Sequence, residues 1–190
     1  MMIETNSFYL DAPSKVMILI INGPLGVGKT SVAEALLYRF PRSVMLDGDA
    51  IGRVHPFEIY DPNRTDYLYR TLAMLLDWHQ REGDYEHFVI NYVFEKPESL
   101  ARLLAQLHPL DPVIRVFRLR ASPETLRARI RKRGGEDDAY LAWELQRGPE
   151  LLRIQDAHGP GDALGEIVET DGLSVAEVAE AIWARVRIND

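Results

Sequence analysis

The chain has 190 residues, and 22 lysines and arginines against 29 aspartates and glutamates give it a formal net charge of −7. This length predicts one globular domain, and the acidic balance argues against a protein that coats nucleic acid, which needs a positive surface. The absence of cysteine excludes disulfides, zinc–thiolate sites, iron–sulfur clusters and thiol nucleophiles.

The apolar runs are too short for a membrane protein. The longest one covers residues 16–21, whereas a membrane-spanning helix needs about 20 apolar residues. The first residues also lack the basic flank and apolar core of a signal peptide. We therefore expect a cytoplasmic protein, a monomer or homodimer, with neither nucleic acid nor membrane as a partner.

Residues 1–15 show no periodicity and are expected to form a tail before a single domain of residues 16–190. In that domain, short apolar runs typical of strands buried on both faces alternate with helical patterns. The expected strands cover residues 16–22, 43–47, 87–93, 113–119 and 166–169. The expected helices cover residues 29–40, 64–81, 97–107, 123–133, 139–157 and 175–186. This alternation predicts an α/β fold with a parallel sheet and right-handed crossovers.

A phosphate-binding motif follows the first expected strand. Residues 23–30 read Gly-Pro-Leu-Gly-Val-Gly-Lys-Thr, a full match to the P-loop pattern between a strand and a helix. The glycines let backbone N–H groups surround phosphate oxygens at a helix N-terminus. Lys29 is expected to reach the β- and γ-phosphates of ATP, and the Thr30 hydroxyl to bind Mg²⁺. The predicted nucleotide-binding residues are Gly23, Gly26, Val27, Gly28, Lys29, Thr30 and Ser31.

Two large classes of P-loop protein lack support in the sequence. GTPases need an Asn-Lys-x-Asp motif, and no asparagine here is followed by lysine. Motor-type and AAA-type ATPases are expected to have an apolar strand that ends in Asp-Glu, and none of the expected strands ends in this way.

The second expected strand ends in an acidic turn, Asp47-Gly48-Asp49. Carboxylates at i and i+2 leave a strand end on the same side, near the phosphate loop at the carboxyl edge of the sheet, where ligands bind in α/β proteins. We expect one carboxylate to hold Mg²⁺ and the other to accept the proton of an attacking hydroxyl.

A basic cluster follows the fourth expected strand. Five of the 22 basic residues fall within residues 127–133, before Gly134-Gly135. Arg129 and Arg133 are four residues apart and share a helix face. We expect them to stabilise the charge on the transferred phosphoryl group, and we expect a mobile lid of about residues 131–147.

These motifs resemble those of the P-loop small-molecule kinases, a group that includes shikimate, gluconate, adenylylsulfate and adenylate kinases. The resemblance covers roughly residues 16–188. It implies a five-stranded parallel sheet of order 2-3-1-4-5 with a lid after the fourth strand, and assigns Asp49 to the acceptor hydroxyl and Asp47 to the metal.

Two narrower resemblances point to antibiotic modification. The Ile-Asn-Gly opening, residues 120–126 and the Thr-Asp-x-Leu-Ser ending are similar to tunicamycin-resistance-type proteins, and the acidic turn with residues 89–94 is similar to chloramphenicol phosphotransferase.

The acceptor site is expected within about residues 50–86, where arginines and aromatic residues gather. Such side chains suit a ring-containing or anionic acceptor, and Arg53 and His55 are the candidates, with Asp49. Strand three ends in Asn91-Tyr92, without the acidic residue or glycine pair that many sugar and shikimate kinases have there, so the resemblance leaves acceptor recognition open.

We expect an ATP- and Mg²⁺-dependent phosphotransferase for a small hydroxyl- or phosphate-bearing acceptor, which is a metabolite, a nucleotide or an antibiotic. The alternative is a nucleotide-binding regulator or slow ATPase that signals through lid closure.

Overall fold

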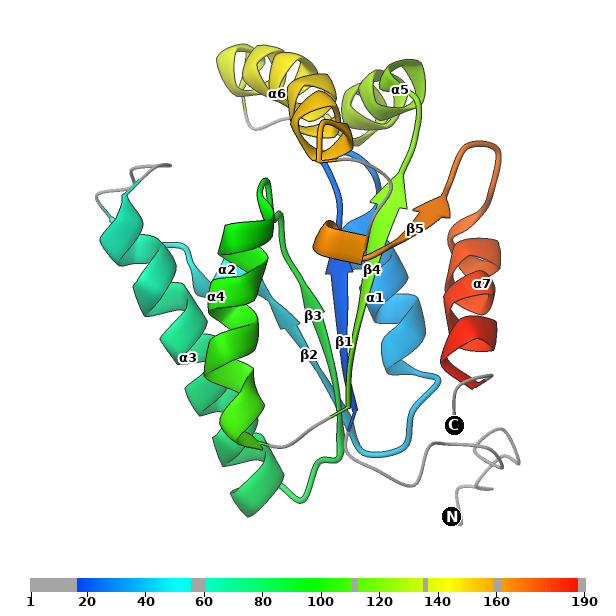
Figure 1. Ribbon diagram of the computed structural model, residues 1–190. Helices are drawn as coiled ribbons and strands as arrows, with labels where there is room; N and C mark the ends of the chain where they lie inside the picture. The colour runs from blue at the N-terminus through cyan, green and yellow to red at the C-terminus, as the bar shows by residue number, and fades with distance from the viewer. Residues whose placement is uncertain (1–16, 56–60, 111–112, 135–136, 159–161, 188–190) are drawn as a thin grey trace.

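The computed structural model describes residues 17–55, 61–110, 113–134, 137–158 and 162–187. Its five strands are β1 (Met17–Asn22), β2 (Ser43–Asp47), β3 (His87–Asn91), β4 (Val113–Arg120) and β5 (Glu166–Glu169). They form one parallel sheet in the order β2-β3-β1-β4-β5 (Figure 1). The predicted α/β class and the strand order implied by the resemblance are both confirmed.

The helices are α1 (Lys29–Leu37), α2 (Gly48–Ile51), α3 (Pro62–Glu82), α4 (Pro97–Leu107), α5 (Pro123–Arg133), α6 (Asp138–Asp156) and α7 (Val175–Arg187). Short 3₁₀ turns cover His108–Leu110 and Asp162–Leu164. The short α2 differs from the turn expected after β2. It forms because the Asp47 carboxylate accepts from the backbone N–H groups of Asp49 and Ala50, which a helix start would otherwise leave unpaired. The expected tail, residues 1–15, lies outside the described residues.

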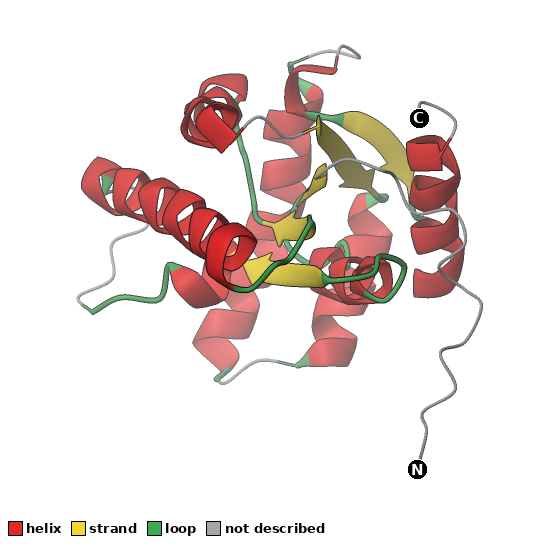
Figure 2. Cartoon of the chain, turned by 90° about the horizontal axis from the view of Figure 1, so that it is seen from below, coloured by secondary structure: helices red, strands yellow, loops and turns green. Residues whose placement is uncertain are grey.

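Helices cover both faces of the sheet, as Figures 1 and 2 show. Successive side chains of β1 point to opposite faces, because a strand has a period of two. Leu19 and Ile21 pack into a core with α1 and α7, which includes Trp183. Ile18 and Ile20 pack into a second core with α3 and α4. β1 is therefore buried on both faces, as its uninterrupted apolar sequence predicts.

α5 and α6 lie over the carboxyl edge of the sheet, at the top of Figure 1. The expected lid, about residues 131–147, corresponds to the last turn of α5 and the first half of α6, and its residues 135 and 136 lie outside the described part of the chain. Its mobility stays a prediction. Among the described helices, none is long and apolar enough to span a membrane.

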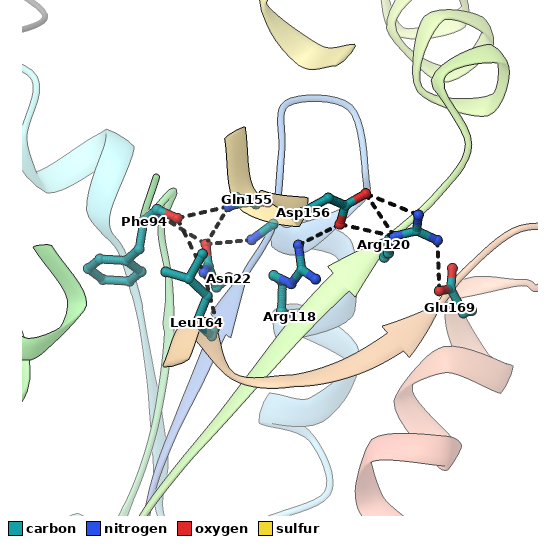
Figure 3. Close-up of polar contacts among 9 residues, drawn as sticks. Asn22, Phe94, Arg118, Arg120, Gln155, Asp156, Leu164 and Glu169 are labelled. Carbon is teal, nitrogen blue, oxygen red and sulfur yellow. Dashed lines mark hydrogen bonds and ion pairs between the residues drawn. The ribbon is translucent and has the colours of Figure 1, made fainter. Parts of the chain in front are cut away.

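A buried asparagine joins the phosphate loop to α6 (Figure 3). Asn22 is fully buried, and its Oδ1 accepts from Gly23 N (2.7 Å), Phe94 N (2.9 Å) and Gln155 Nε2 (3.2 Å). Its Nδ2 donates to Leu164 O at 3.0 Å. Beside it, Asp156 of α6 accepts from Arg118 and Arg120 of β4. The carboxyl end of α6 is therefore held against the ends of β1 and β4.

We expect Asn22→Leu to lower the free energy of unfolding by about 3 kcal/mol, because the two backbone N–H groups that Oδ1 accepts from would stay buried without an acceptor. Urea unfolding followed by circular dichroism measures this change. Asn63→Leu, at an exposed position on α3, is the control and is expected to change stability by no more than about 0.5 kcal/mol. Equal stability of the two variants would contradict the structural role of Asn22.

Candidate active site

The phosphate loop connects β1 to α1 and depends on its glycines, Gly26 and Gly28 among them. Gly26 and Gly28 have φ values of +78° and +103°, in the left-handed region that other residues rarely adopt. A Cβ atom at Gly26 would also lie 2.5 Å from Ile130 Cγ1 of α5. The loop can therefore curve around a ligand while α5 packs directly against its outer side.

Lys29 is the first residue of α1, and only 7% of it is exposed. Its Nζ donates to Pro24 O at 3.1 Å, which holds the amine over the loop. Burial lowers the pKa of Lys29, while the nearby Asp49 and Asp47 carboxylates act in the opposite direction and favour its charged form. An ammonium with few water contacts is well suited to bind a phosphate.

Thr30, Asp47 and Asn91 meet at the ends of three different elements. Thr30 Oγ1 lies 3.2 Å from Asp47 Oδ2, and Asn91 Nδ2 donates to that same carboxylate oxygen at 2.8 Å and to Thr30 Oγ1 at 3.3 Å. The parallel register pairs Asp47 with Asn91 across β2 and β3, which brings them together. The result is a cluster of oxygen atoms beside the loop, the ligand type that Mg²⁺ prefers.

Asp49 follows in the first turn of α2, and its environment differs from that of Asp47. Solvent reaches Asp49 within its cavity, yet the surrounding protein displaces enough water to raise the pKa of its carboxyl group. The positive charges of Lys29 and Arg64 lower this pKa, and the negative charge of Asp47 raises it further. A carboxylate with a raised pKa is better able to accept a proton.

The two predicted arginines of α5 both reach the phosphate loop region, with different partners. Arg129 donates to Val27 O at 3.0 Å and to Thr170 Oγ1 and O at 2.9 and 2.8 Å. The Arg133 side chain is 54% exposed and forms an ion pair with Glu144 of α6 at 2.6 Å. Arg129 therefore ties the loop to the end of β5, whereas Arg133 is paired with α6.

Two cavities open at the carboxyl edge of the sheet. The first has a volume of about 700 Å³ and is lined by loop residues 25–31, by Asp49, by Arg129 and Arg133, and by residues around the start of α7. The second has a volume of about 660 Å³ and is lined by Asp49, Arg53, Arg64, Tyr92, Glu95, Arg133 and a face of α6. Asp49 and Arg133 line both cavities and so stand where a ligand in one would meet a ligand in the other.

The predicted acceptor residues are only partly brought together. Arg53 lines the second cavity, whereas His55 is exposed and not among its lining residues. Tyr69 belongs to the core beneath α3. Phe57 and Tyr60, also in the aromatic and arginine-rich segment, lie outside the described residues. The roles of Arg53 and His55 stay predictions.

Two contributions to the site were not predicted from the sequence. Asn91 binds Thr30 and Asp47, and the only signal for it was a polar residue at the end of an apolar strand. Glu144 lines the second cavity from α6, where an acidic residue within a helical pattern carries no signal of its own.

The chain is similar to one known domain family and to several kinases. A family model described as "AAA domain" matches residues 19–142. A guanylate kinase from Symbiobacterium thermophilum is 28% identical over 90% of this chain and 86% of its own length, and one from Synechococcus is 27% identical over 73% and 71%. The chain matches this model although no described strand ends in Asp-Glu, so the absence of that motif does not separate the chain from the AAA-domain family, contrary to the expectation from the sequence.

Solved structures show the same fold. Shikimate kinase from Acinetobacter baumannii has a TM-score of 0.63 and 18% identity, covering 93% of this chain and 96% of its own. A gluconokinase from Sinorhizobium meliloti has a TM-score of 0.62 and 21% identity (92% and 95% covered), and the tunicamycin resistance protein of Deinococcus radiodurans has 0.61 and 22% (89% and 94%). The resemblance to the P-loop kinase group is confirmed, and the fold is kinase-like.

Proposed function

Because the chain belongs to the AAA-domain family of P-loop proteins, we propose that it is a kinase that uses ATP and Mg²⁺ to phosphorylate a small molecule. The observation that carries this proposal is the pair of cavities that share Asp49 and Arg133. A phosphoryl donor in the first cavity and an acceptor in the second would meet beside those two side chains. A protein that only binds or slowly hydrolyses a nucleotide has no need for the second cavity.

In this proposal the loop residues Gly23 to Ser31 bind the triphosphate, and Lys29 neutralises its β- and γ-phosphates. Asp49 orients the acceptor hydroxyl and takes its proton as the new bond forms. Arg133 stabilises the charge on the transferred phosphoryl group, and Arg129 holds the loop and α5 in the geometry that makes this contact available. Arg53 contributes to acceptor binding from the end of α2.

Thr30 and Asp47 are the residues that would hold Mg²⁺. Asn91 supports the fit, because its Nδ2 fixes both oxygens while its own Oδ1 is buried without a hydrogen-bond partner among the described residues. The ion, when bound, would neutralise charge on the phosphate oxygens. The protein's own part is to keep the Thr30 hydroxyl and the Asp47 carboxylate turned toward the loop.

The test is a screen for acceptor-stimulated ADP release by the purified full chain, with Mg²⁺ and with EDTA. The screen covers nucleosides, nucleoside monophosphates, sugar acids, shikimate, and nucleoside-, phenicol- and aminoglycoside-type antibiotics. This range follows the guanylate kinase, gluconokinase, shikimate kinase and tunicamycin resistance relatives. We expect Mg²⁺-dependent stimulation by one class. No stimulation by any class above the rate without acceptor would contradict the proposed function and favour a regulator.

A further inference from the structure

One face of α6 forms a wall of the second cavity. The α6 residues that line the cavity are Tyr140, Trp143, Glu144, Arg147 and Leu151. Their spacing of i, i+3, i+4, i+7 and i+11 puts them on one side of the helix. The rings of Tyr140 and Trp143 lie 5.5 Å apart. The wall therefore offers two aromatic rings next to a carboxylate and an arginine.

Glu144 is unusual among these residues because its charge is buried. Only 4% of its side chain is exposed, and Oε1 accepts from Arg133 Nη2 at 2.6 Å. The other carboxylate oxygen, Oε2, is buried and has no hydrogen-bond partner in the part of the chain that the structure describes. A buried carboxylate that lacks half of its hydrogen bonds is costly, and a ligand that donates to it would relieve the cost.

Two of the four arginines that line this cavity, those of α5 and α6, are already paired with carboxylates. Arg133 pairs with Glu144, while Arg147 pairs with Glu95 and, at 3.0 Å, with Glu150. Asp49 adds a carboxylate at the place where the reacting atom of the acceptor would lie. A phosphate acceptor would bring a double negative charge next to that carboxylate, whereas a hydroxyl would bring a proton for it to accept.

We propose that the acceptor is a hydroxyl compound rather than a phosphate, and that a second hydroxyl or amino group of the acceptor donates to the unpartnered Oε2 of Glu144, which allows Arg133 to leave Oε1. This inference rests on the proposed kinase function. In the transfer, the acceptor oxygen forms a bond to the γ-phosphorus and the bond from that phosphorus to the β,γ-bridging oxygen breaks, with its electrons leaving on ADP. The proton of the acceptor hydroxyl passes to Asp49.

The exchange at Glu144 links acceptor binding to catalysis. Arg133 lines the nucleotide cavity as well as the acceptor cavity. While Arg133 is paired with Glu144, it is held toward α6. If Arg133 moved away, the buried carboxylate of Glu144 would lose its ion-pair partner. An acceptor that donates to Glu144 removes that penalty and lets Arg133 move to the phosphates. The correct acceptor thus completes the catalytic site, and ATP hydrolysis without acceptor is suppressed.

Glu144→Gln and Glu144→Leu test this exchange. Because both variants release Arg133, we expect ATP hydrolysis without acceptor to rise severalfold, and the rise to disappear in Glu144→Leu combined with Arg133→Ala. The Leu variant is also expected to raise KM for the acceptor about tenfold or more, since the hydrogen bond to the carboxylate is lost. Glu180→Gln, which breaks the remote Arg39–Glu180 ion pair, is the matched control and should change neither value.

Thermal unfolding of both Glu144 variants shows whether they fold, and the near-isosteric Gln variant keeps the test valid if the Leu variant does not. Hydrolysis without acceptor that stays at or below the wild-type rate in the folded variant would overturn the exchange, because a merely structural Glu144 would only lower activity.

The acceptor class is tested on the wild-type protein with matched probes. Shikimate, gluconate and an aminocyclitol supply a hydroxyl nucleophile and a second donor, and cyclohexanol supplies a hydroxyl alone. GMP supplies a phosphate, and phosphorylation at that phosphate is recognised by the formation of GDP. We expect ADP release to be stimulated by at least one of the first three and by neither of the others. Formation of GDP from GMP would overturn the inference while leaving the kinase function standing, and failure of all three hydroxyl probes with a second donor would overturn it as well.

Discussion

Replacing Lys29 with methionine is expected to reduce ATP turnover by roughly a hundredfold to a thousandfold, as the loss of a charged group at a transferring phosphate does. Lys29 is almost fully buried and held over the phosphate loop by Pro24 O, so its positive charge has a fixed position at the loop. Methionine keeps much of the side-chain volume while removing the positive charge. Steady-state ADP release with the best acceptor measures the loss, and calorimetry measures the accompanying decrease in ATP affinity.

Lys132→Met is the control for this substitution. Lys132 is exposed on α5 and does not line either cavity, although it lies close to Arg133 in sequence. The control should keep wild-type turnover and ATP affinity. If Lys29→Met bound ATP as tightly as the wild type, the loop would not be a triphosphate site, and both the kinase proposal and its regulator alternative would be wrong.

The fold and the conformation of the phosphate loop could be predicted because their signals are local. These signals are contiguous in sequence, and each of them excludes other local conformations. They are the apolar run of β1, the glycines and Lys29 of the loop, and the start of α1. The short α2 was expected as a turn, because an Asp-Gly-Asp sequence suits a turn as well as a helix that Asp47 caps.

The rest of the candidate site could be predicted less well, because it is assembled from distant segments. Asn91 reaches Thr30 and Asp47 only through the pairing of β2 with β3, and no local pattern states which strands are neighbours. The α6 wall exists because α6 crosses the carboxyl edge of the sheet, held by Gln155 and Asp156. Conversely, Tyr69 could be a ligand or a core residue by sequence, and α3 buries it.

Asp49→Asn is expected to lower kcat by roughly a hundredfold or more while leaving ATP affinity nearly unchanged, because the variant keeps the shape of the side chain and cannot accept the hydroxyl proton. Single-turnover measurements separate this chemical step from binding. Asp138→Asn, exposed in the first turn of α6 and outside both cavities, is the control. Because the pKa of Asp49 is raised, wild-type activity should fall toward acid as this carboxylate takes up a proton.

The same raised pKa gives Asp49→Asn an opposite effect on stability. In the unfolded chain the carboxyl ionises near pH 3.8, and in the folded protein it ionises at a higher pH. The stability that Asp49 contributes is therefore complete below pH 3.8 and is lost as the pH rises through the folded pKa. At neutral pH the variant, which has no charge to desolvate, should unfold at a modestly higher temperature than the wild type, and this advantage should disappear in acid. A variant that gained stability while keeping full turnover would show that Asp49 is a strained carboxylate without a catalytic role.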